Sequence, residues 1–309
     1  MSPSDLFFVD HALSARLEAA EVAQVEAMAR AVAERQPERG VALLSIAGGC
    51  ASFVGPNISV SRAVGLGMSG PVTPADLDAL ENFYRSRNSE ARLYVSPFAR
   101  PSLFEGLGER GFRVRDLMTT LARPLSGAEP FAEPAGARNE RGAGAMGSRE
   151  AREAREAREA GERAVREAGE MKVRRAGLEE AAAWADALLR GFSSADEPPH
   201  RDHVAVFEAA FHDSSALYFF ATIGGAIAGT AGMRIHGSLA HFYGASTQPA
   251  ARGRGVQAAL IDHRLEIARA RGCDFAFTVT EAGTTSQRNF ERRGFRTVYS
   301  RARMTKRFD

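Results

Sequence analysis

Cysteine is nearly absent from this chain of 309 residues, since Cys50 and Cys273 are the only two. They lie far apart in apolar surroundings, which argues against a disulfide framework or a metal site and fits a reducing cytoplasm. No apolar run is long enough to span a bilayer, and no basic region followed by an apolar stretch begins the sequence. We therefore expect a globular cytoplasmic protein with no metal and no membrane partner.

The chain also has almost no net charge, because its 40 Lys and Arg nearly balance its 38 Asp and Glu. The charges are unevenly distributed, however, and residues 288–307 hold eight basic side chains against the single acid Glu291. A basic segment of this kind favours a polyanion, either a phosphate-bearing cofactor or a nucleic acid. Aromatic residues that would stack on bases are few in it, so the nucleic acid is the less favoured partner.

A clear hydrophobic pattern is missing between residues 126 and 171. The first part of this stretch is rich in Gly, Ala and Pro, and Arg149-Glu150-Ala151 is then repeated four times without an apolar stripe for docking. We interpret 126–171 as a linker that joins an N-terminal domain at 1–125 to a C-terminal domain at 172–309.

The C-terminal domain alternates helix and strand patterns around one glycine-rich turn. The expected elements are helices at 178–191 and 203–212, strands at 217–223, 227–235 and 240–246, a helix at 256–271, a strand at 275–280, a helix at 286–293 and a strand at 296–306. The turn Arg252-Gly253-Arg254-Gly255-Val256-Gln257, called the socket below, opens the helix at 256–271. Such a turn leaves backbone N–H groups pointing outward at the positive end of the helix dipole, where a pyrophosphate can bind.

The socket and the later block Ser286-Gln287-Arg288-Asn289-Phe290-Glu291-Arg292-Arg293-Gly294-Phe295 together resemble the GNAT superfamily of acetyl-CoA-dependent N-acetyltransferases. The resemblance covers residues 171–309 well. It implies acetyl-CoA as the cosubstrate and a mixed, mostly antiparallel sheet with one splayed parallel strand pair, flanked by helices. The cofactor-binding residues that it implies are Ala245, Ser246, Thr247, Arg252, Gly253, Arg254, Gly255, Val256, Gln257, Asn289 and Arg292. Gln257 departs from the family pattern, which usually has Gly or Ala there.

The catalytic residues are less clearly marked than the socket. In the superfamily an amine attacks the thioester directly, and the usual proton donor is a tyrosine four residues before the Gly-Phe glycine. That position is Phe290 here, which cannot donate a proton. Glu281 and Tyr243 are the candidates that we select, while Tyr299, water or an unassisted thiolate remain open in place of a tyrosine donor. Three histidines and one further acid remain open as bases: His200, His203, His241 and Glu197.

The N-terminal domain repeats the same layout at a constant shift of 183 residues. Residues 107–113 align with 290–296, which places a helix pattern at 73–87 and a strand pattern at 92–97 under the corresponding C-terminal elements. The socket falls on residues 69–74, where two prolines remove N–H donors. We therefore interpret this domain as a degenerate GNAT-like copy that does not bind CoA in the usual way. It should shape the acceptor pocket or form an interface, which leaves a homodimer open.

The fold class that follows is α/β (α+β), with two GNAT-like domains. The expected function is transfer of an acetyl group from acetyl-CoA to a primary amine of a small molecule or peptide, in a ternary complex. The alternative is a non-catalytic acyl-CoA sensor or scaffold, which Phe290 and the lack of a clear base favour. The richness in Ala, Arg and Gly suggests a GC-rich bacterial genome.

Overall fold

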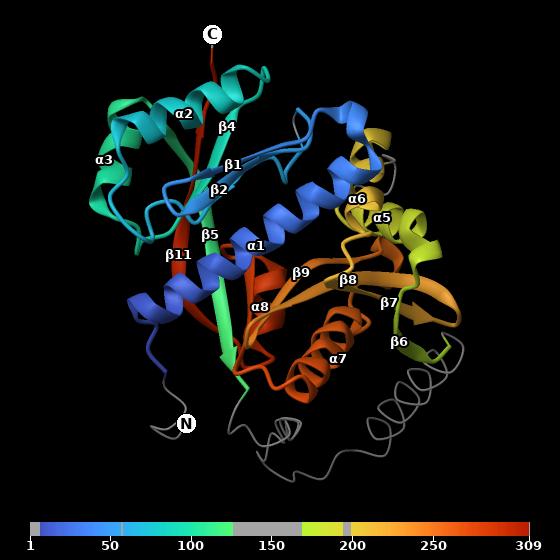
Figure 1. Cartoon of the computed structure of the whole chain (residues 1–309). Helices are drawn as coiled ribbons and strands as arrows, with labels where there is room; N and C mark the ends of the chain where they lie inside the picture. The colour runs from blue at the N-terminus through green and yellow to red at the C-terminus, as the bar shows by residue number, and fades with distance from the viewer. Residues whose placement is uncertain (1–6, 57, 126–168, 194–198, 309) are drawn as a thin grey trace, which may run out of the picture.

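The computed structural model describes residues 7–56, 58–125, 169–193 and 199–308, which form one continuous sheet covered by helices (Figure 1). In the N-terminal half the elements are α1 (His11–Arg35), β1 (Ala42–Ile46), β2 (Gly49–Phe53), β3 (Ala63–Val64), α2 (Pro74–Arg85), β4 (Ala91–Val95), α3 (Pro101–Glu109) and β5 (Arg113–Pro124). In the C-terminal half they are β6 (Met171–Arg175), α5 (Ala181–Arg190), α6 (Arg201–Ala210), β7 (Ala216–Ile223), β8 (Ala226–His236), β9 (Leu239–Thr247), α7 (Val256–Ala270), β10 (Phe275–Glu281), α8 (Thr285–Glu291) and β11 (Arg296–Lys306). The expected linker lies outside the described residues except at 169–171, where β6 begins.

The internal repeat expected from the sequence appears in the element bounds. β5 begins at Arg113 and β11 at Arg296, and the difference of 183 is the expected shift. Helices α2 and α7, strands β4 and β10, and helices α3 and α8 follow one another in the same order in the two halves. The mixed, mostly antiparallel sheet is also confirmed, with two parallel strand pairs, β3 with β4 and β9 with β10.

The sheet order shows that the two halves exchange their last strands. The order is β1-β2-β3-β4-β11-β5-β10-β9-β8-β7-β6. Strand β5 of the N-terminal half pairs with β10, while β11 of the C-terminal half pairs with β4, and the two exchanged strands pair with each other. The alternation of side chains along a strand is the same in either position, so the sequence pattern does not reveal this exchange. Each half therefore needs the other to complete its sheet.

The helices cover both faces of the sheet. In the C-terminal half α7 and α8 pack on one face, around a core that includes Phe242, Leu260 and Phe290. Helices α5 and α6 pack on the opposite face, around Trp184 and Tyr218. Helix α1 lies on this second face and runs across the sheet to α6, as Figure 1 shows. The longest helix of the N-terminal half thus covers part of the C-terminal half.

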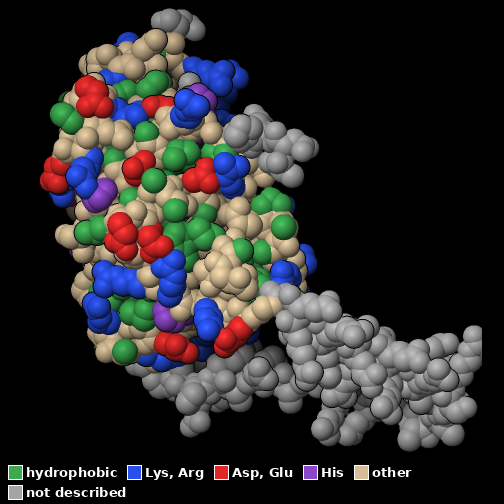
Figure 2. Space-filling model, turned by 90° about the vertical axis from the view of Figure 1, so that its right-hand side faces the viewer, with side chains coloured by type: hydrophobic (Ala, Val, Ile, Leu, Met, Phe, Trp, Pro, Cys, Tyr) green, Lys and Arg blue, Asp and Glu red, His purple; other side chains and the backbone are tan. Residues whose placement is uncertain are grey.

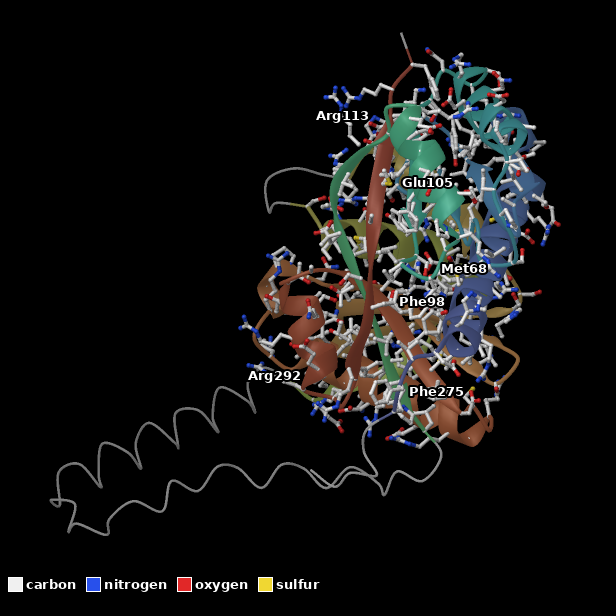
Figure 3. The ribbon with its side chains drawn as sticks, turned by 90° about the vertical axis from the view of Figure 1, so that its left-hand side faces the viewer. Met68, Phe98, Glu105, Arg113, Phe275 and Arg292 are labelled. Carbon is white, nitrogen blue, oxygen red and sulfur yellow. The ribbon has the colours of Figure 1, made fainter. Side chains whose placement is uncertain are left out.

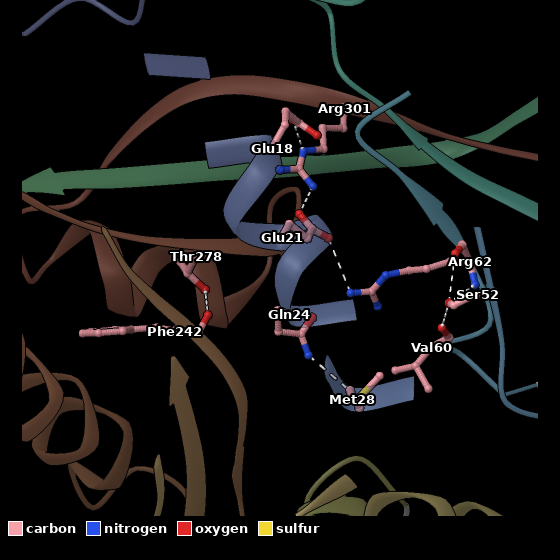
Figure 4. Close-up of polar contacts among 10 residues, drawn as sticks. All are labelled: Glu18, Glu21, Gln24, Met28, Ser52, Val60, Arg62, Phe242, Thr278 and Arg301. Atoms are coloured by element: carbon pink, nitrogen blue, oxygen red, sulfur yellow. Dashed lines mark hydrogen bonds and ion pairs between the residues drawn. The ribbon is translucent and has the colours of Figure 1, made fainter. Parts of the chain in front are cut away.

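A buried ionic cluster fastens α1 to the exchanged strand β11. The guanidinium of Arg301 lies 3.0 Å from Glu18 and also bonds Glu21, and these three side chains are almost fully buried (Figure 4). Arg62 reaches Glu21 at 3.4 Å, and the Tyr299 hydroxyl donates to Glu18 at 2.9 Å. Burial alone would raise the pKa of Glu21, but the positive charges of Arg301 and Arg62 outweigh it and hold that pKa at about 2. Glu21 is therefore ionised, and its ionised form depends on the positive charges of Arg301 and Arg62.

Candidate functional site

Strands β9 and β10 separate at the point where the resemblance requires a splay. Their parallel ladder runs from Phe275 opposite Leu239 to Thr278 opposite Phe242, and the Thr278 hydroxyl donates to the Phe242 carbonyl at 2.9 Å. Beyond it β9 continues through 243–247 and β10 through 279–281 with no pairing between them in the described structure. A bulge at Gly244, with a φ of 56°, bends β9 away. The backbone of β9 that faces β10 is therefore available to a ligand.

The socket follows directly after β9 and forms the N-terminus of α7. Gly253 and Gly255 have φ values of 75° and 79°, which only glycine adopts without strain, and Gly255 is the N-cap residue. A Cβ at either position would meet no atom within 4 Å, so the backbone conformation, and not the space, requires glycine. No described side chain caps this helix N-terminus. The first N–H groups of α7 are thus free of a capping side chain.

The side chains around the socket are held by neighbouring elements. Gln257 donates from Nε2 to the Thr247 hydroxyl at 3.0 Å, which ties the socket to the end of β9. Arg252 donates to the Gly191 carbonyl at 3.0 Å, and Arg254 lies exposed on the turn. Val256 is buried in the core beneath the helix. The departure at Gln257 therefore supports the turn and leaves its backbone accessible.

The three expected strand residues direct their side chains into the protein. Ser246 is buried against Thr230 at 3.1 Å and the Ala187 carbonyl at 3.2 Å, while Ala245 packs on the core under α7. Together with Thr247, bound by Gln257, they offer the splayed space their backbone. Only the backbone is needed for strand-like pairing with an extended ligand. Their assignment to cofactor binding stays a prediction.

Asn289 and Arg292 lie at the C-terminal end of α8, which packs against α7. Asn289 is half-buried, and Arg292 is the exposed C-cap residue whose side chain projects from this edge of the molecule in Figure 3. A cationic side chain in this place is suited to an external phosphate. The roles expected for these two residues remain predictions.

Tyr243 and Glu281 lie on the two splayed strands. Tyr243 is half-buried beside Trp184 and Tyr218 on the face that α5 and α6 cover. Burial, followed by the negative charge of Asp213, raises the pKa of its phenol, which therefore keeps its proton at neutral pH. Glu281, the last residue of β10, is exposed and lies 3.6 Å from Arg303. The structure thus places a phenol on one splayed strand and a carboxylate on the other, and their catalytic roles stay predictions.

The other candidates occupy structural positions. His241 is buried with its ring stacked on Phe277 at 4.3 Å, and burial lowers its pKa to about 3, so it is neutral. Phe290 is buried in the core against Phe295. His200 caps α6 by accepting from the backbone of Asp202, and His203 lies in the first turn of that helix. Glu197 lies outside the described residues.

The corresponding region of the N-terminal half is closed. The Thr73 hydroxyl accepts from the backbone N–H of Asp76, and the Asp76 carboxylate accepts from the backbone N–H of Thr73, so α2 is capped by its own side chains. The loop before α2 inserts three side chains into the core of this half: Leu66, Met68 and Val72. An internal carboxylate therefore occupies the helix N-terminus where an external anion would bind.

The basic segment 288–307 is largely paired with acids. Arg293 pairs with Asp262, and Arg301 with the two glutamates of α1. Three more pairs reach acids of the N-terminal half: Arg303–Asp116, Lys306–Glu81 and Arg307–Glu90. Figure 2 shows a different face of the molecule, where basic and acidic side chains are also interspersed. The excess of positive charge in the sequence of this segment is therefore mostly neutralised in the fold.

Arg303 and Asp116 were not selected from the sequence, although they lie beside Glu281. Arg301 and Arg303 are two residues apart on β11, so their side chains lie on the same face of the strand. Nothing in the sequence indicates that this strand lies beside β5.

Within the described ranges, no group of three or more His, Cys, Asp or Glu is arranged to hold a metal ion. Among the described helices, none has the length and apolar character needed to cross a membrane.

Comparison with solved structures supports this reading of the fold. A GCN5-related N-acetyltransferase from Kribbella flavida superposes with a TM-score of 0.54 at 15% identity, over 91% of this chain and 96% of that one. A tandem GNAT protein from the clavulanic acid biosynthesis pathway gives a TM-score of 0.48 at 14% identity, over 74% and 66% of the two chains. A GCN5-related N-acetyltransferase from Sphaerobacter thermophilus gives 0.44 at 17% identity, over 71% and 59%. The similarity to the Kribbella protein extends over both halves of the chain.

Comparison by sequence finds a family match for part of the chain. No curated protein matches the chain significantly. Residues 181–295 match the model of the acetyltransferase (GNAT) family. This range contains the splayed strands, the socket and α8. Residues 181–295 are therefore assigned to a GNAT-family domain.

Proposed function

We propose that the protein transfers an acetyl group from acetyl-CoA to a primary amine of a small molecule or peptide, by direct attack in a ternary complex. The observation that supports this most is the open glycine turn at the start of α7, next to the free backbone of β9. We also propose that the cofactor-binding unit comprises residues 172–309, separated by a linker at 126–171 from residues 1–125. Since β10 pairs with β5, this unit depends on the N-terminal half for its sheet.

The residues present suit the pyrophosphate and pantetheine parts of the cosubstrate. The backbone around Gly253 and Gly255 presents N–H groups without a Cβ in the way, and the helix dipole of α7 favours a negative charge there. The free backbone of β9 suits an extended chain with amide groups. When bound, acetyl-CoA supplies an activated carbonyl carbon and a thiolate leaving group.

The two splayed strands can manage the protons of the reaction. The amine forms a C–N bond to the acetyl carbon as the C–S bond breaks, and its excess proton goes to the Glu281 carboxylate. The phenol of Tyr243, held neutral by burial, gives its proton to the departing thiolate. Tyr243 thereby takes the role for which Phe290, buried in the core, is unsuited.

The test compares a glycine of the socket with a glycine of the corresponding N-terminal turn, both in the full-length protein. Gly255→Asp places a carboxylate in the socket, where it should repel the diphosphate and weaken acetyl-CoA binding by at least about tenfold in calorimetry. Gly70→Asp alters the corresponding turn of the N-terminal half, where a Cβ meets nothing within 4 Å, and should leave binding unchanged. Release of free thiol with a panel of primary amines then measures turnover. A wild-type protein that gives no binding heat with acetyl-CoA contradicts the proposal.

A second function, acyl-CoA sensing without catalysis, is favoured by one observation. Phe290 occupies the usual donor position and is packed against Phe295 in the core, so this position cannot act in proton transfer. A sensor would bind acetyl-CoA as tightly as the enzyme does but release no thiol with any amine. Thiol release that depends on an added amine contradicts the sensor.

A further inference from the structure

A charged network crosses four strands beside the splay. Arg303 of β11 is directly opposite Tyr94 of β4 on one side and Asp116 of β5 on the other. Its guanidinium bonds the Asp116 carboxylate and lies 3.6 Å from Glu281 of β10. The hydrogen bond with Asp116, helped by one with Tyr94, raises the pKa of Arg303. Two of these four side chains, Tyr94 and Asp116, belong to the N-terminal half.

The register places this network on the same face of the sheet as Tyr243. Glu281 is opposite Met118, two residues from Asp116 along β5, so both acids share one face of the sheet. Phe277 shares that face, and His241 stacks on it, two residues from Tyr243 along β9. Tyr243 and Glu281 therefore look onto the same side, opposite to the face that carries α7 and α8.

The network is open to a solute. The side chains of Glu281, Asp116 and Arg303 are 61%, 36% and 19% exposed. Two carboxylates and one guanidinium give it a net charge of −1. The neighbouring buried cations do not cancel this charge, because Arg301 is paired with Glu18 and Glu21, and Arg234 with Asp213 at 2.6 Å.

We propose that Asp116, Arg303 and Glu281 form the wall of the acceptor site, and that this wall selects amines that carry a second positive charge on the same molecule. This inference rests on the proposed acetyl transfer and names its acceptor class. Asp116 holds Arg303, and Arg303 positions Glu281 where the amine must lose its proton. The N-terminal half, whose own socket is closed, thereby contributes to the specificity of the other half through the exchanged strands.

The test uses a ratio that does not depend on how much protein is folded. For each full-length variant, kcat/KM is measured with 1,3-diaminopropane and with propylamine, and the first value is divided by the second. Arg303→Gln makes the wall more negative and should raise this ratio about threefold, the effect of one unit charge roughly 8 Å away in a largely aqueous site. Asp116→Asn and Glu281→Gln should each lower it about threefold for the same reason.

Three controls sharpen the result. Arg303→Lys keeps the charge and should keep the wild-type ratio. Arg307→Gln removes an arginine further along the chain, which pairs with Glu90 at the surface, and should change nothing. Raising the ionic strength from about 0.01 M to about 1 M shortens the Debye length tenfold, so the wild-type preference for the diamine should shrink.

The outcomes separate the two proposals. If the ratio of the two kcat/KM values does not change with the charge of the variants, the proposed acceptor wall is wrong, even if both amines are acetylated. Acetyl-CoA binding without acetylation of any amine overturns the proposed transfer, and the acceptor wall falls with it. Glu281→Gln should in addition lower kcat about 100-fold on both amines, because it removes the proposed proton acceptor. A kcat equal to that of the wild type contradicts this role.

Discussion

The two halves of the molecule share one layout but differ at the start of the equivalent helices α2 and α7. The N-terminal half closes this helix end with Thr73 and Asp76, and its preceding loop is buried in the core. The C-terminal half leaves the same place uncapped, with two glycines in a left-handed conformation. The anion site that we propose at α7 thus depends on a few positions where no side chain caps the backbone N–H groups. The N-terminal half, whose helix end is capped, still supplies strands that the common sheet requires.

The largest expected effect comes from breaking the buried cluster that joins the halves. Arg301→Leu leaves Glu18 and Glu21 buried without their main partner, which should cost about 3–5 kcal/mol of unfolding free energy. Chemical denaturation followed by the fluorescence of Trp184, in the C-terminal half, and by circular dichroism of the whole chain measures it. The two signals should change together, because the sheet is continuous.

The surface variant Arg307→Gln is the control for this loss, since its ion pair with Glu90 is exposed on the arginine side. It should change the unfolding free energy by less than about 1 kcal/mol. If the C-terminal half of the Arg301→Leu variant unfolds in a separate step at unchanged stability, the cluster does not join the halves energetically.

The next effect is a pH dependence of stability at the contact between α1 and β9. His241 has its pKa lowered to about 3 by burial, whereas the unfolded chain binds a proton near pH 6.5. The unfolded state therefore binds more protons below pH 6.5, and stability should fall as the pH drops towards 3. The contribution of this one group is at most about 1.4 kcal/mol per pH unit.

His241→Phe should flatten that dependence while keeping the stacking on Phe277. Unfolding free energies from urea titrations between pH 7 and pH 4 measure the difference between the variant and the wild type. Parallel pH curves for the two proteins would show that His241 is not the group responsible. Glu21 has a pKa of about 2 in the folded chain and near 4.5 in the unfolded chain, so its contribution is lost between these two pH values and overlaps the His241 range only below about pH 4.5.

The smallest effect sharpens the comparison of the two turns. Gly253 has a φ of 75°, and Gly70, at the equivalent position 183 residues earlier, is not among the glycines with positive φ. Gly253→Ala should cost about 1–2 kcal/mol through backbone strain and should also weaken acetyl-CoA binding. Gly70→Ala should change stability by no more than about 0.5 kcal/mol. Thermal unfolding and calorimetry on both variants measure this, and equal effects would contradict the difference in backbone conformation.

The local elements of the C-terminal half could be predicted well from the sequence. The helix at 256–271, the strand at 275–280 and the strand at 296–306 agree with α7, β10 and β11 within one residue at each end. These segments have strong periodicity and clear glycine stops, so local physics decides them. The repeat at 183 residues extended the same reasoning to α2 and β4.

Features that depend on long-range packing could not be predicted in the same way. Helix α1 has apolar residues at helical spacing, but Glu18 and Glu21 on its buried side obscure the apolar stripe. The reason for two buried acids on this helix is evident only from the structure, in which the exchanged strand β11 places Arg301 in contact with them. The Arg303–Asp116 pair is hidden for the same reason, since its partners are 187 residues apart in the chain.

The exchanged strands also suggest why the N-terminal half, with its capped helix α2, is retained in the chain. The strands on either side of β5 and β11 follow one another in mirrored order, and the two central strands are antiparallel. Two identical protomers arrive at this arrangement when each donates its final strand to the other about a two-fold axis, so the chain is organised like a domain-swapped dimer fused end to end. In such an architecture a copy that loses its ligand site cannot be deleted, because its removal would bare the edge of β10 to aggregation. The N-terminal half is then retained because it protects this strand edge, even if it binds no ligand.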